Sequence, residues 1–206
     1  MEIPDTLPAR LYLLAYDPVK QRLASPGPLG YLLRAAALVD LQLRGHLADR
    51  DGTPQVNARM AQPADPVLAG VLRDVAESRP RPWRHWVRKH ARATTAAVAD
   101  QLAAGGWIEL QPRRVVPFDK VTLHRPEAVT ELGNLIRAAL RESTPVAEVD
   151  PRAAALVALA AAGDLGTALP VKQHERRIAA LTEVAGEAAP ALRTVIRLFA
   201  PVIDAG

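Results

Sequence analysis

The sequence predicts a mainly α protein, a single helical domain over residues 1–206 with a central helix bundle, amphipathic helices around it and two small β-hairpins. Three observations support this fold class. Alanine, leucine and arginine are abundant, and all three favour helices. Helix-start pairs occur at Asp65-Pro66 and Asp150-Pro151. The 206 residues, 49% hydrophobic and 23% charged, suit one folded domain.

Several of the expected helices begin at one of these start pairs or end at a glycine. Gly45, Gly105 and Gly163 each follow a long apolar stretch, where a glycine commonly closes the last turn. Within the second helix, Asp40 and Arg44 are four residues apart and are expected to form an ordinary surface ion pair. The expected helices cover residues 7–15, 29–43, 66–78, 83–104, 126–141, 151–162, 171–185 and 188–199.

Two strand–turn–strand patterns follow glycine-terminated helices. Residues 46–56 place Asp51-Gly52, a preferred two-residue hairpin turn, between two short extended stretches. Residues 107–116 repeat the arrangement, with 107–110 and 115–116 as the strands and a charged turn between them. We therefore expect two hairpins, each preceded by a helix.

Signals of catalysis are missing from the sequence. The chain contains no cysteine, which excludes disulfides, cysteine-ligated metals and thiol nucleophiles. It has no phosphate-binding loop, no dinucleotide-binding glycine motif and no nucleophile elbow. None of its three serines lies near a histidine and an orienting acid, and its five histidines lack the spacing of a zinc helix. The sequence predicts neither an enzyme nor a bound cofactor or metal.

Positive charge is concentrated in residues 79–92. This segment holds six Lys and Arg residues and no acid, whereas the rest of the chain has a net charge of −2 against +4 for the whole. Such a segment is either a solvated helix face or a surface for phosphate groups of nucleic acid or lipid. We interpret it as an anion-binding surface.

Within and near this segment, four cations are candidate headgroup ligands. Arg88, Lys89 and Arg92 share a helix face without a local acid, so a bridging anion would relieve their repulsion. Arg34 has no acidic neighbour within one helical turn on its apolar face, so it requires either a distant carboxylate or a bound anion. Trp83 and Trp86 are candidates for membrane contact, with burial in the core as the alternative.

Two other functions remain open at this point. A helix followed by a two-stranded wing is typical of winged-helix DNA-binding domains, and residues 83–104 with their hairpin would fit that pattern. Alternatively, the chain is an interaction scaffold whose basic segment is only solvated.

Several segments, in order, resemble the Golgi phosphoprotein 3 family, whose domain also occurs in actinobacterial proteins. The resemblance runs through nearly the whole chain. It is carried by Leu11–Asp17, Leu38–Leu47, Asp65–Leu68, Trp86–Arg88, Gln101–Ile108, Pro117-Phe118 and Asp150–Leu156.

The resemblance implies a mainly helical domain without enzymatic activity. Eukaryotic members are peripheral membrane proteins that bind phosphatidylinositol 4-phosphate in a basic pocket and hold glycosyltransferase tails. The family's pocket uses a tryptophan, an arginine in the first long helix and an Arg-x-x-Arg pair in a later helix. The first arginine corresponds to Arg34 and the first of the pair to Arg92, while the second of the pair and the tryptophan correspond to Thr95 and Ser25.

These features together predict a cytoplasmic adaptor that docks on anionic, phosphoinositide-like lipid at the inner face of the membrane. A protein client is expected, and no nucleic acid. The family's second hairpin is associated with self-association, which implies a homo-oligomer here. The candidate residues of that hairpin are Trp107, Arg113, Arg114 and Phe118.

Overall fold

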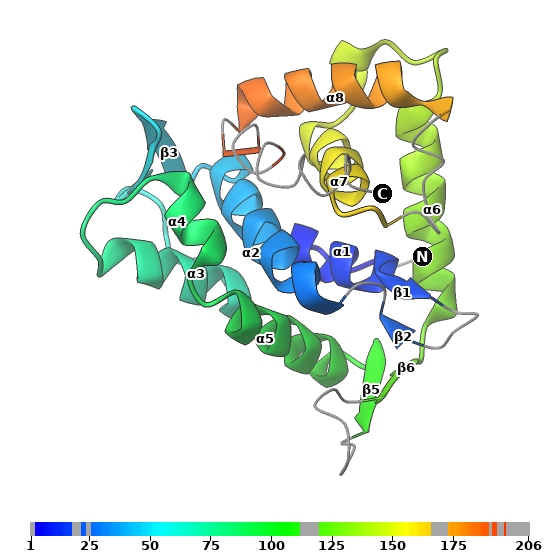
Figure 1. The fold of residues 1–206 in the computed structure, drawn as a ribbon, viewed down its shortest axis with the longest axis horizontal. Coiled ribbons are helices and arrows are strands. Elements are labelled where there is room, and N and C mark those ends of the chain that lie inside the picture. Colours follow the sequence, from blue (N-terminus) through cyan, green and yellow to red (C-terminus); the bar gives the residue numbers. More distant parts are fainter. Residues whose placement is uncertain are drawn as a thin grey trace.

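A central helix organises the structure, a computed structural model. Helix α2 (Pro26–Leu43) packs against α1 (Leu7–Leu14), α3 (Pro66–Ala76), α4 (Trp83–Arg88), α5 (Ala91–Ala104) and α7 (Pro151–Ala162) (Figure 1). Helices α6 (Pro126–Leu140) and α8 (Glu175–Ala188) and the short 3-10 helix η1 (Val146–Glu148) complete the described helices. The structure describes residues 3–17, 22–23, 26–111, 120–165, 173–189, 191–192 and 196.

The composition of α2 explains its central position. Every residue from Leu32 to Asp40 is buried, and the small side chains of Ala35, Ala36 and Ala37 let neighbouring helices approach. Gly30 permits the closest approach, because a Cβ there would lie 2.9 Å from the carbonyl oxygen of Ala91 on α5. Helix α5 therefore begins directly against the N-terminal part of α2.

Among the described residues, three antiparallel strand pairs lie at the edge of this helical core (Figure 1). The turn between the strands of the second pair has Asp51 at φ 52° and Gly52 at φ 76°, the left-handed geometry expected from an Asp-Gly hairpin. The pairs are β1 (Tyr16–Asp17) with β2 (Arg22–Leu23), β3 (Leu47–Arg50) with β4 (Thr53–Val56), and β5 (Ile108–Gln111) with β6 (Lys120–Leu123).

A buried carboxylate joins three helices of the core. Asp40 is 0% exposed. Its Oδ2 accepts a hydrogen bond from the Leu7 amide at 2.8 Å, and its Oδ1 lies 3.0 Å from Arg44 Nε and 3.2 Å from Arg152 Nη2. The predicted pairing of Asp40 with Arg44 is confirmed, but the carboxylate belongs to the interior and fastens α1 and α7 to α2.

The mainly α fold and the hairpin at 46–56 are confirmed. The second hairpin forms, but the structure pairs residues 108–111 with 120–123, and the expected strand at 115–116 lies outside the described residues. The pair β1–β2 was not predicted. Of the final expected helix, residues 188–199, only part is described: Ala188 is the last residue of α8, Ala189 is not helical, and residues 191–192 and 196 are helical.

The predicted continuous helix over residues 83–104 is wrong. Helix α4 ends at Arg88, Lys89 is extended, and His90 takes a left-handed φ of 57° before α5 begins at Ala91. Contacts with residues outside the segment hold this break: Lys89 Nζ donates to Ser78 Oγ at 3.0 Å, and His90 Nδ1 lies 3.1 Å from Asp74 Oδ2. Apolar spacing continues across the break, so periodicity could not reveal it.

Candidate anion-binding face

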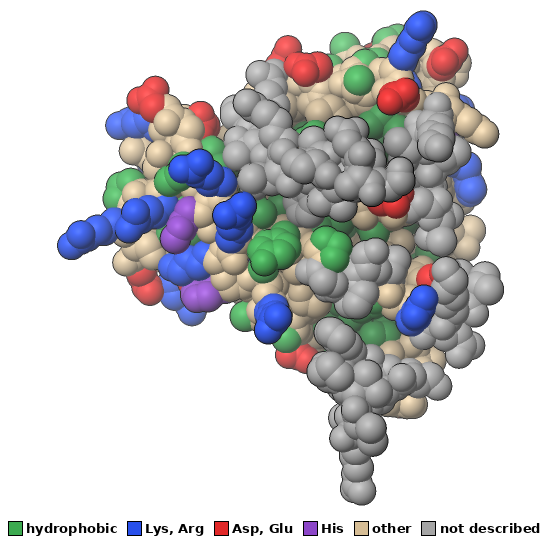
Figure 2. All heavy atoms as spheres, viewed as in Figure 1, with side chains coloured by type: hydrophobic (Ala, Val, Ile, Leu, Met, Phe, Trp, Pro, Cys, Tyr) green, Lys and Arg blue, Asp and Glu red, His purple; other side chains and the backbone are tan. Residues whose placement is uncertain are grey.

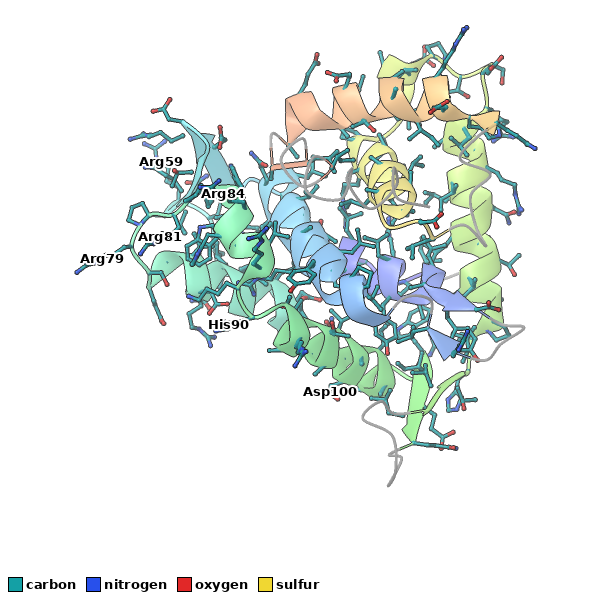
Figure 3. The ribbon with its side chains drawn as sticks, viewed as in Figure 1. Arg59, Arg79, Arg81, Arg84, His90 and Asp100 are labelled. Carbon is teal, nitrogen blue, oxygen red and sulfur yellow. The ribbon has the colours of Figure 1, made fainter. Side chains whose placement is uncertain are left out.

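The cations of residues 79–92 gather at one end of the molecule. Figure 2 shows Lys, Arg and His side chains clustered there, and Figure 3 shows Arg59, Arg79, Arg81 and Arg84 along the same edge. All four are exposed. We define the basic face as Arg59, Arg79, Arg81, Arg84, His85, Arg88 and His90, all of which are exposed.

Two buried indoles hold the basic face in position. Trp83 and Trp86 are 2% and 1% exposed, which agrees with the core interpretation and leaves neither ring available for membrane contact. Trp83 Nε1 donates to Asp49 on β3, and the Trp83 amide donates to the carbonyl of Gly52 at 3.3 Å. Trp86 Nε1 donates to the carbonyl of Arg81 at 2.9 Å. These bonds join α4 to the β3–β4 hairpin and to the loop that carries Arg81.

On α4, the spacing of the buried residues leaves one side of the helix in solvent. Trp83, Trp86 and Val87 point inward, so Arg84 and Arg88, four residues apart, share the outer side. Lys89 differs from the arginines because it is half-buried, donates to Ser78 and lies 5.0 Å from the centre of the Trp86 ring. Arg84 and Arg88 are therefore better placed than Lys89 to meet an external anion.

Arg34 is a buried residue with an internal partner. Its side chain is 3% exposed, its Nη2 lies 2.7 Å from Asp74 Oδ2, and its Nε donates to the carbonyl of Trp86 at 3.2 Å. Burial raises the pKa of the Asp74 carboxyl, but hydrogen bonds from Arg34 and His90 outweigh burial and hold that pKa below its ordinary value. The alternative in which a distant carboxylate satisfies Arg34 matches this geometry.

Arg92 does not share the buried environment of Arg34. It is exposed in the first turn of α5, whereas Arg34 is held by groups of α3 and α4. Helices α2 and α5 are in close contact nearby, because a Cβ on Gly30 would lie 2.9 Å from the Ala91 carbonyl oxygen and 3.0 Å from Thr95 Oγ1. The described residues thus place Arg34 and Arg92 in different environments, one internal and one in solvent.

The hairpin residues expected to mediate self-association are only partly described. Trp107 is half-buried, and the guanidinium carbon of Arg125 lies 4.4 Å from the centre of its ring. Arg113, Arg114 and Phe118 lie outside the described residues. Oligomerisation through this hairpin stays a prediction.

Helix α5, the expected recognition helix of the winged-helix alternative, offers few side chains for reading DNA. Its exposed residues include one cation, Arg92, and one acid, Asp100, which Figure 3 places along the outer side of the helix. The other exposed positions are alanines, at 93, 96, 97 and 104. Base readout needs side chains that donate or accept hydrogen bonds, so this helix gives the alternative no support.

A cavity of about 250 Å³ lies away from the basic segment, and none of its lining residues comes from 79–92. Arg44, His46 and Asp65 contribute to its wall. His46 is 9% exposed, and its Nδ1 has no hydrogen-bond partner in the part of the chain that the structure describes. Within that same part, no group of three or more His, Cys, Asp or Glu residues could hold a metal ion.

Two residues of this region were not found from the sequence. Arg59 stands alone in a polar stretch after β4, and only the fold brings it to the same end of the molecule as the arginines of 79–84 (Figure 3). Asp74 is one of several acids on or near α3, and no pattern in the sequence marks it as the partner of Arg34.

The chain was compared with curated proteins and with models of protein families. None of the curated proteins compared matches the chain. The model of the Golgi phosphoprotein 3 (GPP34) family matches residues 7–198, a range that includes α1 to α8 and the basic segment. The match covers far more than half of the 206 residues, and the chain therefore belongs to the Golgi phosphoprotein 3 (GPP34) family.

Proposed function

We propose that this protein is a non-enzymatic adaptor that docks reversibly on anionic membrane lipid through its basic face. The observation that carries the proposal is the exposure of Arg79, Arg81, Arg84 and Arg88 at one end of the molecule, in a segment without acids. Membership of a family whose eukaryotic proteins bind phosphatidylinositol 4-phosphate supports the same conclusion.

The expected strength follows from the number of exposed cations. One basic residue near an anionic bilayer contributes about 1 kcal/mol, so four arginines give moderate and reversible binding. Arginine also forms paired hydrogen bonds with phosphate oxygens. No helix in the described part of the chain is long and apolar enough to cross a membrane.

The location and partners follow from this proposal. The inner face of the cell membrane carries anionic lipid and is the site we propose for docking. A client protein would then be held at that surface, as in the eukaryotic members of the family. Self-association through the second hairpin would multiply the number of basic faces on one bilayer.

Vesicle co-sedimentation tests the proposal. We expect the protein to sediment with phosphatidylcholine vesicles that contain phosphatidylglycerol, and to remain in solution with phosphatidylcholine alone. Binding should be strong at roughly 0.05 M salt and largely lost near 0.5 M, because salt screens exposed charges. Equal sedimentation with both vesicle types would contradict the proposal.

A parallel gel shift with duplex DNA separates lipid from nucleic acid. At the same salt concentration we expect weak, sequence-independent retardation. Tighter binding to DNA than to the anionic vesicles would instead favour a nucleic-acid-binding function.

A further inference from the structure

One acid forms an ion pair with the basic segment in the described part of the chain. Asp74 on α3 contacts His90, and the same oxygen, Oδ2, contacts Arg34. The three side chains run from the interior to the surface, with 3% of Arg34, 25% of Asp74 and 56% of His90 exposed. A carboxylate thus lies between a buried guanidinium and an exposed imidazole.

Asp74 contacts two side chains whose N–H groups could otherwise bind a phosphate group. Arg34 Nη2 and His90 Nδ1 converge on one oxygen, at 2.7 and 3.1 Å. Guanidinium and imidazole N–H groups are common partners of phosphate oxygens, and an arginine binds them most strongly. The Asp74 carboxylate supplies one anionic oxygen to both donors, and its negative charge would repel a phosphate beside them.

An external phosphate cannot share this place with Asp74. The carboxyl is held in its charged form by its two partners, and a second anion within hydrogen-bond distance of Arg34 would lie beside it. By contrast, Arg79, Arg81 and Arg84 are exposed and form no ion pair with a described residue, so they meet any anionic surface without a fixed geometry.

We propose that Asp74 is a specificity-determining residue: as an internal anion it closes Arg34 and His90 to phosphate headgroups, and docking therefore depends on surface charge and not on headgroup identity. This inference rests on the proposed function. It predicts that the wild-type protein binds vesicles of equal charge equally, whether the charge comes from phosphatidylglycerol or from a lipid with a terminal phosphate such as phosphatidylinositol 4-phosphate. It also predicts that removing the Asp74 charge creates headgroup selectivity.

The experiment compares Asp74→Asn with a matched control. Glu77→Gln removes the same charge from an exposed residue just after α3 and leaves Arg34 paired. Both variants should bind anionic vesicles somewhat better than the wild type, because both raise the net charge. Only Asp74→Asn should prefer phosphatidylinositol 4-phosphate vesicles over phosphatidylglycerol vesicles of equal charge, by about tenfold or more. If Asp74→Asn and Glu77→Gln showed the same ratio of affinities for phosphatidylinositol 4-phosphate and phosphatidylglycerol vesicles, the inference would be overturned.

A second variant covers the case in which Asp74→Asn does not fold. The double variant Arg34→Gln with Asp74→Asn removes both charges of the pair. If Asp74 closes Arg34 in the wild type, the double variant and the wild type should bind both vesicle types with affinities within about twofold. A wild-type preference for phosphatidylinositol 4-phosphate that disappears in the double variant would show that Arg34 contacts the headgroup, against the inference.

Thermal denaturation with inorganic phosphate separates this inference from the proposed function. Phosphate at millimolar concentration should raise the melting temperature of Asp74→Asn but not that of the wild type or of Glu77→Gln, because a ligand of the folded state stabilises it. That result would support the inference even if wild-type protein bound no vesicles, which would contradict only the proposed function. The same small shift in all three proteins would indicate a general salt effect and would contradict the inference.

Discussion

Replacing Arg79, Arg81 and Arg84 together by glutamine is expected to weaken binding to anionic vesicles by roughly 100-fold. Each of these exposed arginines contributes about 1 kcal/mol near an anionic surface, and about 1.4 kcal/mol corresponds to a factor of ten. Their side chains form no ion pair with a described residue, so the fold should remain unchanged. Titration of the protein with phosphatidylglycerol-containing vesicles measures the effect.

A control variant separates position from net charge. Arg137, Arg141 and Arg176 are also exposed, but they lie on or beside α6 and α8, away from the basic face (Figure 1). Replacing these three by glutamine removes the same charge and should weaken binding by less than about threefold. Equal losses in the two triple variants would mean that net charge, and not the basic face, governs binding.

The second large effect concerns stability. Asp40→Ala should lower the free energy of unfolding by about 1–3 kcal/mol, because it leaves the buried Leu7 amide without its acceptor, while Arg44 and Arg152 keep Asp5 as a partner. Asp40 is 0% exposed and contacts the Leu7 amide, Arg44 and Arg152. Without this carboxylate, α1 and α7 each lose a polar contact with α2. Denaturation in urea, followed by circular dichroism, measures the change.

Asp100→Ala is the matched control for stability. Asp100 is exposed on α5, so its replacement should change the free energy of unfolding by no more than about 0.5 kcal/mol. If Asp40→Ala cost as little as Asp100→Ala, the carboxylate would not be the junction of the three helices that the structure indicates.

The helices could be predicted largely because their ends are encoded locally. Asp65 and Asp150 accept hydrogen bonds from amides of the first turns they precede, and Gly163 follows the last residue of α7. Asp51 and Gly52 adopt the left-handed conformations that their hairpin turn requires. Such features depend on a few neighbouring residues, so the sequence alone reveals them.

The break between α4 and α5 and the partner of Arg34 depend on distant residues. Arg34 and Asp74 are 40 positions apart, and the sequence predicts Arg34 as a headgroup ligand, with a distant carboxylate as the alternative. His90 and Lys89 are held by Asp74 and Ser78, which belong to the preceding helix and its end. Contacts between elements, and not the pattern within one element, decide both features.

The burial of the two tryptophans has a similar origin. Trp83 and Trp86 stand among cations, a composition typical of a membrane interface as well as of a helix that packs on a core. Their indole N–H groups bond to Asp49 and to the carbonyl of Arg81, and these partners become visible only in the folded structure. With the rings buried, exposed arginines remain the part of this segment that can meet lipid.

Site-specific labelling tests most directly which face of the protein meets the membrane. The chain has no cysteine, so a single introduced cysteine carries a polarity-sensitive fluorophore at a known position. Pro80→Cys places it between Arg79 and Arg81, and Thr130→Cys places it on α6, far from the basic face (Figures 1 and 3). Both residues are exposed, and neither change alters the charge.

With phosphatidylglycerol-containing vesicles, we expect the fluorophore at position 80 to shift to the blue and to be quenched by spin-labelled lipid, while that at position 130 remains unchanged. Neither probe should respond to neutral vesicles. A response at position 130 without one at position 80 would contradict docking through the basic face.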